Sequence, residues 1–374
     1  MANIQALGEL INWVDVRNKG VISDNLLGIN IDKFFMPSVA NIIGTDLSSY
    51  KLIRNKQFAC NPMHVGRDEK MPIALYMDDS PSIVSPAYFV FEVKDAAKIN
   101  PEYLMLWFRR AEFDRECWYH TDGSVRGGIT WDEILEMTVP VPSIEEQNEL
   151  VKSYRNIERR IQIKKEINDN LEAQAITLFN EYFMFEIENA EHTFGEYVSF
   201  AQGTQVPVDE QLSSNKPNTV RFVRIIDYTT DGQEPPRYIY PPNNSTYIND
   251  DEVAVVRYGN IGLIGRRFSG IIANNLFKVV PKNLEITNHF IYYYLNHPKI
   301  QRILKSSEES SAMPAIKHST VANLPINSIN SEQLHLFELF ASKIERVIVE
   351  NKGEIVSLSQ MSTNILSSLA SLSR

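Results

Sequence analysis

The chain carries the same helix-start signal twice. Residues 139–150 read VPVPSIEEQNEL, and residues 324–336 read LPINSINSEQLHL. Ser143 stands three residues before Glu146, which is the spacing of a capping box, and Asn330 stands three residues before Gln333. The two caps are 187 residues apart in a chain of 374. The spacing therefore predicts one structural unit present twice, with a helix beginning at each cap.

Another match keeps the same offset. The stretch PEYLMLWF at 101–108 corresponds to NHFIYYYL at 288–295. Upstream of this point, residues 1–100 and 190–287 differ strongly from one another. One end of each repeat is thus similar, and the other end is free to differ.

Each cap opens a long apolar pattern. Apolar side chains at steps of three and four predict an amphipathic helix, and a repeat of seven predicts a coiled-coil seam. Asn351 stands on a seam position, where a polar residue fixes register at some cost in stability. Gly353 weakens the helix by about 1 kcal/mol and permits a bend. An ordinary helix on a core is the alternative, but two helices of matched length favour an antiparallel pair with approximate two-fold symmetry. The predicted stripe of the first helix, which is less strict but still helical, contains Ile144, Gln147, Val151, Tyr154, Ile157, Ile161, Ile167, Leu171, Leu178 and Tyr182. The predicted seam of the second helix contains Phe337, Phe340, Ile344, Val347, Asn351, Leu358, Met361 and Ile365.

The segments before the helices mix strands with short helices. β-Branched content predicts strands, turn residues crowd between them, and helical periodicity returns before each cap. The fold class is therefore α+β, with two globular parts, each followed by a long helix. The predicted strands are 219–228, 251–258 and 271–280, and the predicted short helices are 100–110 and 287–304. The predicted domains are 1–142 and 190–329, followed by helices at 143–189 and 330–374.

Several function classes find no support in the sequence. No apolar run is long enough to span a membrane, and two cysteines give no disulfide framework. The seven histidines lack metal-binding spacing, and no nucleophile elbow or phosphate loop occurs. GNIGLIG at 259–265 fits neither a dinucleotide fingerprint nor a phosphate loop. The net charge of −10 by itself argues against nucleic-acid binding.

What remains indicates recognition. In RYGNIGLIGRR, arginine, tyrosine and asparagine surround glycines that permit close backbone approach. Arginine pairs with guanine edges and asparagine with adenine edges. For any single residue here, a solvated surface charge or an ordinary turn is the alternative. The candidate DNA contacts are Asn61, His64, Arg67, Ser124, Arg126, Arg257, Tyr258, Asn260, Arg266, Arg267, Asn274, Asn275 and Lys317.

Taken together, these stretches resemble the specificity subunit of Type I restriction–modification enzymes. The resemblance covers nearly the whole chain. It depends most on the two junctions, PVPSIEEQ at 140–147 and PINSINSEQ at 325–333. The second half adds VVRYGNIGLIG, ANNLFKVVPK and SSAMPAIKHSTVANLPI.

The resemblance implies a function. Each globular part would be a target recognition domain that reads one half of a bipartite sequence in double-stranded DNA. The helices would form an antiparallel coiled coil that sets the distance between the halves. The subunit-docking and coiled-coil residues would be Tyr154, Ile157, Ile161, Leu171, Phe340, Ile344, Val347, Asn351, Leu358 and Ile365.

The resemblance also implies partners. The chain itself would do no chemistry and bind no cofactor or metal. Two methyltransferase subunits would use S-adenosylmethionine, and restriction subunits would use ATP and Mg²⁺. The complex would work in a prokaryotic cytoplasm, without a membrane. Partner subunits could supply phosphate contacts that this acidic chain lacks. The alternative is a tandem-repeat scaffold or adaptor that binds proteins through its long helices.

Overall fold

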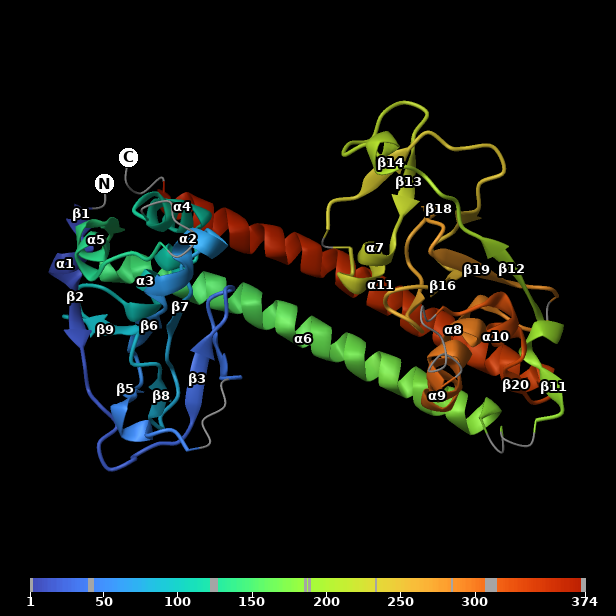
Figure 1. Cartoon of the computed structure of the whole chain (residues 1–374), viewed down its shortest axis with the longest axis horizontal. Helices are drawn as coiled ribbons and strands as arrows, with labels where there is room; N and C mark the ends of the chain where they lie inside the picture. The colour runs from blue at the N-terminus through green and yellow to red at the C-terminus, as the bar shows by residue number, and fades with distance from the viewer. Residues whose placement is uncertain are drawn as a thin grey trace. The chain divides into compact units, whose positions relative to one another are not determined.

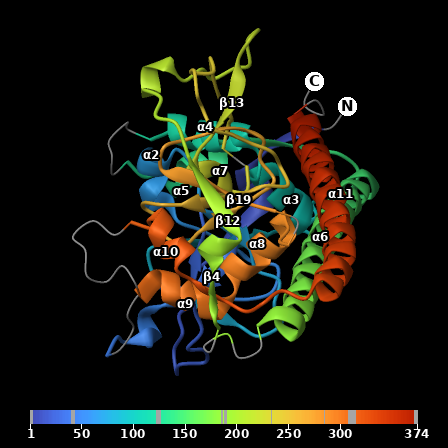
Figure 2. The same ribbon diagram turned by 90° about the vertical axis from the view of Figure 1, so that its right-hand side faces the viewer.

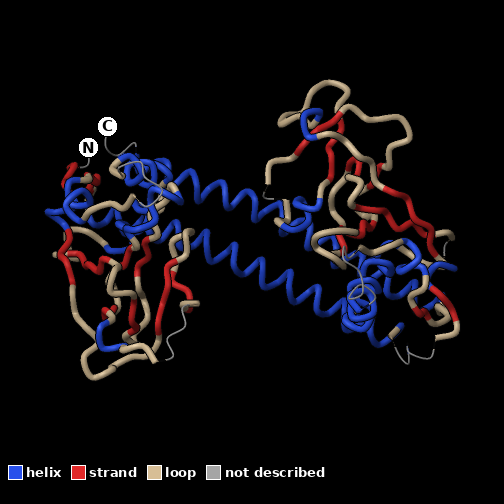
Figure 3. Tube along the Cα trace, in the orientation of Figure 1, coloured by secondary structure: helices blue, strands red, loops and turns tan. Residues whose placement is uncertain are grey.

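The two long helices begin where their caps predicted. In the computed structural model, α6 comprises Ile144–Phe183 and α11 comprises Ser331–Leu369, and both stand out as the longest blue coils in Figure 3. The backbone N–H of Glu146 donates to Ser143 Oγ at 3.3 Å, and the Glu146 carboxylate accepts from the Ser143 N–H at 3.0 Å. Asn330 Oδ1 accepts from the Gln333 N–H at 3.1 Å. Both predicted caps are confirmed.

The structure describes residues 3–39, 44–121, 127–184, 187, 190–232, 234–283, 285–306 and 315–370. Contacts divide the chain into two compact units. Unit 1 comprises Met1–Lys164 with Gly353–Arg374, and unit 2 comprises Lys165–Lys352. The division falls inside the long helices rather than at their ends, so each unit contains a part of α6 and a part of α11.

Unit 1 contains three small sheets. β1 pairs with β10; a four-stranded sheet has the order β2-β9-β6-β7; and a second has the order β4-β3-β8-β5, with β3 and β8 parallel. Its strands are β1 Asn3–Ala6, β2 Ile11–Val14, β3 Leu26–Ile29, β4 Phe35–Pro37, β5 Lys51–Ile53, β6 Phe58–Cys60, β7 Ile73–Leu75, β8 Ser82–Val84, β9 Phe89–Val93 and β10 Thr138–Val141. Its short helices are α1 Leu7–Leu10, η1 Leu47–Ser49, η2 Pro62–His64, α2 Val65–Asp68, α3 Pro101–Phe108, α4 Ala111–Tyr119 and α5 Trp131–Glu136.

Unit 2 repeats this topology sheet for sheet. β11 pairs with β20, and the two larger sheets have the orders β12-β19-β16-β17 and β14-β13-β18-β15, with β13 and β18 parallel. Its strands are β11 His192–Thr193, β12 Val198–Gln202, β13 Val220–Val223, β14 Arg237–Ile239, β15 Tyr247–Ile248, β16 Val253–Val256, β17 Ile264–Gly265, β18 Gly270–Ile272, β19 Leu276–Pro281 and β20 Pro325–Ile326. Its short helices are η4 Phe194–Glu196, η5 Val208–Glu210, α7 Ile225–Thr229, α8 Asn288–Asn296, α9 Pro298–Ser306 and α10 His318–Ala322.

The repeat extends into the segments whose sequences differ. α3 and α8, α4 and α9, and β9 and β19 each begin 187 residues apart. In the variable part the offset grows, because β3 and β13 begin 194 residues apart and β5 and β15 begin 196 apart. Loop insertions therefore change the spacing while the strand order stays the same.

The helix segments pair antiparallel within each unit. In unit 1, Ser362 Oγ lies 2.9 Å from Glu158 Oε1, and Arg160 Nη2 lies 2.9 Å from Glu354. In unit 2, the side chains of Asn168 and Asn351 are hydrogen-bonded at 2.8 Å, and the rings of Phe179 and Phe337 lie 5.3 Å apart. Partner numbers rise on α6 as they fall on α11, which confirms the antiparallel pair. In Figure 2, which faces unit 2, both helices lie on one side of the strands of that unit.

The predicted seam needs correction at several positions. Val347 is 40% exposed and Met361 is 53% exposed, whereas Ile348 and Ser362 are buried. Tyr154, Ile161, Ile344, Asn351 and Leu358 are buried as predicted, and Ile157, Leu171, Phe340 and Ile365 are partly buried. On α6, Ile167 is exposed and the neighbouring Asn168 is buried instead. The seam therefore shifts by one residue in places, because a straight helix of 3.6 residues per turn drifts away from a strict repeat of seven.

Each unit has one main apolar core between a sheet, the short helices and the long helices. In unit 1, the rings of Phe58 and Phe91 stack 5.0 Å apart, and Tyr154 and Leu369 close the same core. In unit 2, Phe179 and Phe290 lie 5.1 Å apart, and Phe337 completes the cluster. Figure 1 shows α3 and α8 beside the long helices in their respective units.

Some short elements differ from the prediction. Residues 219–228 were predicted as one strand, but β13 ends at Val223, and α7 begins at Ile225 after its N-cap residue Arg224. Residues 271–280 divide into β18 and β19, and 287–304 divides into α8 and α9 at Pro298, which suits the first turn of a new helix. Within the described ranges, no helix combines the length and apolar character that crossing a membrane requires.

Candidate nucleic-acid interface

Three segments of unit 2 meet at one end of the sheet that contains β16. They are the loop after β16, the turn between β18 and β19, and the segment before α10. The Arg257 N–H donates to the Asn275 carbonyl at 2.9 Å, and the Ile316 N–H donates to the Arg257 carbonyl at 3.1 Å. These bonds bring together the predicted contacts Arg257, Tyr258, Asn260, Asn274, Asn275 and Lys317.

The loop after β16 turns sharply because of its glycines. Gly259 has φ +83° and Gly262 has φ +80°, in the left-handed region that favours glycine. All four residues of β16 are buried, so the chain leaves a packed strand directly into this loop. Tyr258 is 41% exposed, and Asn260, Asn274 and Lys317 are also exposed. The loop thus presents polar and aromatic side chains from a rigid strand end.

Arg257 is the most constrained side chain of this group. Its Nη1 donates to Gln202 Oε1 at 2.8 Å, and its guanidinium carbon lies 5.0 Å from the centroid of the Tyr258 ring. Arg257 is partly buried. An arginine fixed in this way presents a defined donor plane, which guanine recognition requires.

His318 lies behind Arg257, at the start of α10. Its ring stacks on Phe200 at 5.2 Å and meets Phe277 edge-on at 4.6 Å. Burial lowers the pKa of His318, and the nearby Arg257 charge lowers it further. A neutral ring here avoids placing a second positive charge beside the arginine.

Arg266 and Arg267 have different partners from those predicted. Arg266 is buried, with its guanidinium 3.8 Å from the Tyr292 ring centroid and 2.6 Å from a Glu345 oxygen. Arg267 donates to both carboxylate oxygens of Glu345, at 2.6 and 2.9 Å. We therefore remove both arginines from the candidate interface, because their charges are used to attach the β17 end to α11. Sequence alone showed only two arginines after a glycine.

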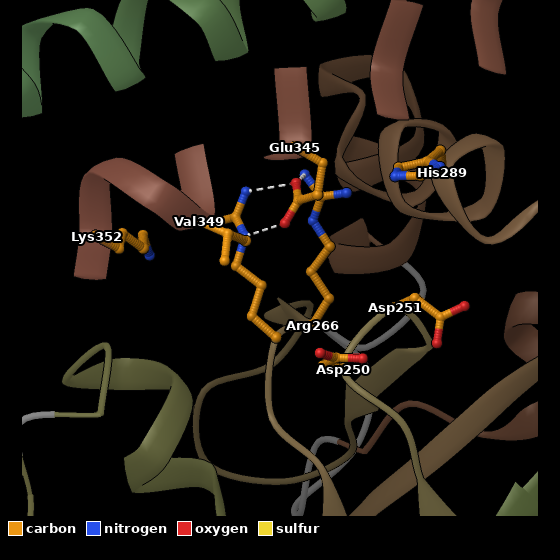
Figure 4. Close-up of a pocket in the computed structure, with 8 residues that line it drawn as sticks. Asp250, Asp251, Arg266, His289, Glu345, Val349 and Lys352 are labelled. Carbon is orange, nitrogen blue, oxygen red and sulfur yellow. Dashed lines mark hydrogen bonds and ion pairs between the residues drawn. The ribbon is translucent and has the colours of Figure 1, made fainter. Parts of the chain in front are cut away.

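These arginines line a pocket of about 300 Å³, shown in Figure 4. Asp250 and Asp251 approach it from the strand side, and Glu345 and Lys352 lie on α11. Burial raises the pKa of Glu345, but the hydrogen bond from Arg267 and the charges of both arginines reverse this effect, so the net pKa lies below its ordinary value. Burial by itself would lower the pKa of Arg267, but its hydrogen bond and ion pair with Glu345 raise that pKa overall. Ion pairing therefore dominates this junction.

Unit 1 builds the corresponding edge with other residues. The Ile129 N–H donates to the Pro62 carbonyl at 3.2 Å, as Ile316 does to Arg257 in unit 2, and 129 and 316 are 187 apart. A Cβ on Gly128 would lie 3.0 Å from that Pro62 oxygen, so the close approach favours glycine. The backbone contact is shared while the side chains differ.

The structure gives the predicted contacts of unit 1 different roles. Asn61 Oδ1 caps η2 by accepting from the Met63 N–H at 3.1 Å. Arg67 is exposed and pairs with the adjacent Asp68 at 2.6 Å. Ser124 and Arg126 lie outside the described residues, as does the side chain of His64. Asn61 thus has a structural role, and Arg67 remains a candidate DNA contact.

Gln202, Phe200 and His318 were missed by the sequence reasoning. Gln202 ends β12, more than fifty residues before Arg257, and nothing in the sequence links the two. In the described part of the chain, no group of three or more histidine, cysteine or acidic side chains could hold a metal ion.

Comparisons with known proteins found a family model that matches part of the chain and solved structures that align with it. Residues 51–173 match the sequence model of the Type I restriction modification DNA specificity domain. The fold is similar to the Type I restriction–modification S subunit from M. genitalium, with TM-score 0.63, 13% identity, and coverage of 99% of this chain and 96% of that chain. The HsdS subunit from Thermoanaerobacter tengcongensis aligns over 98% of this chain and 96% of that chain at 17% identity, but with TM-score 0.38. No curated protein sequence matches the chain.

Proposed function

We infer that the chain is a specificity subunit of a Type I restriction–modification enzyme, in which each unit reads one part of a DNA target. One observation carries this inference: the chain builds the same three-sheet unit twice and places different side chains on the same edge. A matching domain model over 51–173 and a matching fold over the whole chain support it. Two readers on one chain suit a target made of two separate elements.

The edge of unit 2 has suitable chemistry for base recognition. Arg257 supplies a fork of donors, Asn260 and Asn274 supply exposed amides, and Lys317 supplies an exposed positive charge. A good bidentate contact discriminates a base by about 1–3 kcal/mol, whereas phosphate contacts give affinity without sequence information. The net charge of −10 leaves much of the phosphate contact to partner subunits.

The chain contributes recognition rather than catalysis in this proposal. Methyltransferase subunits, two per complex, would carry S-adenosylmethionine and modify adenine, and restriction subunits would use ATP and Mg²⁺ to translocate and cut. The long helices would hold these partners. A scaffold that binds only proteins is the competing hypothesis. The exposed polar side chains at the edge of unit 2 do not favour it.

The test is methylation mapping with a reconstituted complex. Genomic DNA is methylated by the partner methyltransferase with and without this chain, and modified adenines are mapped by sequencing. We expect a bipartite motif only when the chain is present. Replacing residues 190–329 with those of another specificity subunit should change one half of the motif and leave the other. Methylation that ignores the chain would contradict the proposal.

A further inference from the structure

The side-chain amide of Gln202 is fixed at both of its ends. Its Nε2 donates to the Asn274 carbonyl at 2.7 Å and to the Leu276 carbonyl at 3.2 Å. Its Oε1 accepts from Arg257 Nη1 at 2.8 Å. Because the amino group must face two main-chain carbonyls, the amide oxygen must face the arginine. The amide therefore has one orientation, although the side chain lies at the surface.

The anchors of Gln202 are themselves rigid. The next residue, Gly203, donates its N–H to the Leu276 carbonyl at 3.0 Å. A Cβ on Gly203 would lie only 2.0 Å from the Ala273 carbonyl oxygen, so β12 can approach the turn this closely only with glycine here. The Gln202 carbonyl accepts from Thr246 Oγ1 at 2.6 Å. The backbone around Gln202 is therefore held from two sides.

Arg257 gains its orientation from these contacts. Gln202 holds Nη1 from one side, while the Tyr258 ring lies 5.0 Å from the guanidinium carbon. The main-chain bonds of Arg257 to Asn275 and Ile316 fix its Cα. A planar guanidinium reads a base edge through two parallel N–H groups, so its plane must be set before DNA arrives.

We propose that Gln202 is a positioning residue that sets the plane of the Arg257 guanidinium and so determines the base that unit 2 reads at one position of its half-site. This proposal rests on the proposed function. Gln202 acts through Arg257 and is not itself a base-contacting residue.

Among the described residues of unit 1, the position that corresponds to Gln202 has different partners. The residue 187 positions before Gln202 is Asp15, which follows β2. Asp15 pairs with Arg17 at 3.1 Å and with Lys51 at 3.7 Å, and thus balances charges near η1 and β5. The same place in the fold therefore carries a different network in each unit, as expected for readers of different sequences.

The experiment compares Gln202→Leu and Gln202→Met with the wild type in the reconstituted methyltransferase complex. The substrate is a DNA library randomised over both half-sites, and modified molecules are sequenced. We expect preference at one base pair of one half-site to fall at least about fivefold, while the other half-site stays unchanged. Gln211→Leu is the control, because the Gln211 side chain donates to the Val206 carbonyl of its own loop.

A second arm tests whether Gln202 acts through Arg257. Arg257→Ala should relax the same base pair, and adding Gln202→Leu to it should change the motif no further. Additive changes, an unchanged motif, or an equal loss at every site in both Gln202 variants would overturn the positioning role. If the wild-type complex itself shows no bipartite preference, the proposed function fails instead, so the two failures are distinguishable.

Discussion

Asn351 of α11 donates its side-chain N–H to Asn168 Oδ1 of α6 at 2.8 Å. Both residues are buried, at 7% and 9% exposure, in an otherwise largely apolar helix seam. A buried amide pair is satisfied only when the two helices are in one register, because a slip along the seam would leave both amides unpaired. The pair therefore fixes the register between the unit 2 segments of α6 and α11.

Single and double substitutions of this pair should behave differently. Asn351→Leu leaves Asn168 buried without its partner and should lower the free energy of unfolding of unit 2 by about 1–3 kcal/mol. Asn168→Leu with Asn351→Leu removes both amides and should restore most of that loss. Urea unfolding followed by far-UV circular dichroism measures the effect. All four tryptophans, at 13, 107, 118 and 131, lie in unit 1, so their fluorescence is an internal control. A double variant as unstable as the single one would contradict the pairing argument.

Substitutions at Arg257 and Arg267 should separate effects on DNA recognition from effects on stability. Arg267→Met leaves Glu345 and its partners unbalanced in a mostly buried site and should cost unit 2 about 3 kcal/mol. Arg257→Ala should leave the unfolding midpoint nearly unchanged and relax the methylation motif in one half-site. Measuring both properties on both variants gives the comparison. If Arg267→Met changed the motif without loss of stability, our removal of Arg267 from the interface would be wrong.

Acid should weaken unit 2 through Glu345. Its pKa in the folded chain lies below the ordinary value of about 4.3, so its ion pairs contribute fully above that value. The contribution is lost as pH falls from there through the lower folded value. Glu345→Gln should therefore be less stable at pH 7, with a flatter decline between about pH 5 and pH 3. Glu338, which lies 2.7 Å from His289, also has a lowered pKa and remains in both proteins. Parallel pH curves for the two proteins would exclude a role for Glu345.

Two glycines should respond in opposite directions to alanine. Gly203→Ala drives a Cβ against the Ala273 carbonyl and should destabilise unit 2 by about 1–3 kcal/mol, with loss of preference in its half-site. Gly353→Ala meets nothing within 4 Å inside α11 and should stabilise the chain by about 1 kcal/mol. Thermal unfolding of both variants tests this pair. Equal effects of the two substitutions would mean that a clash with the Ala273 carbonyl is not what restricts position 203 to glycine.

Much of the architecture was visible in the sequence because its causes are local. The caps at Ser143 and Asn330 depend on residues within three positions, so their spacing identified both long helices. Asn351 stood out as a polar residue in an apolar stripe. The seam at Val347 was misplaced because Ile348 is equally apolar, and only the partner helix decides which of the two is buried.

The candidate site was harder to predict because its contacts are distant in sequence. Arg267 meets Glu345 from 78 residues away, and Arg257 meets Gln202 from 55 residues away. An arginine has the same appearance in a sequence whether it pairs with a carboxylate or faces solvent. The sequence therefore located the loop after β16 but could not sort its arginines by role.

Unit 1 contains two separate segments of the chain, Met1–Lys164 and Gly353–Arg374, and this affects the order in which its parts are synthesised. Leu369 is fully buried in the same core as Val151 and Tyr154. A ribosome must synthesise all of unit 2 before residues 353–374 emerge. The first part of unit 1 is therefore complete long before the segment of α11 that packs against it. A premature stop after Lys352 would then leave all of unit 2 present and remove residues that complete the core of unit 1.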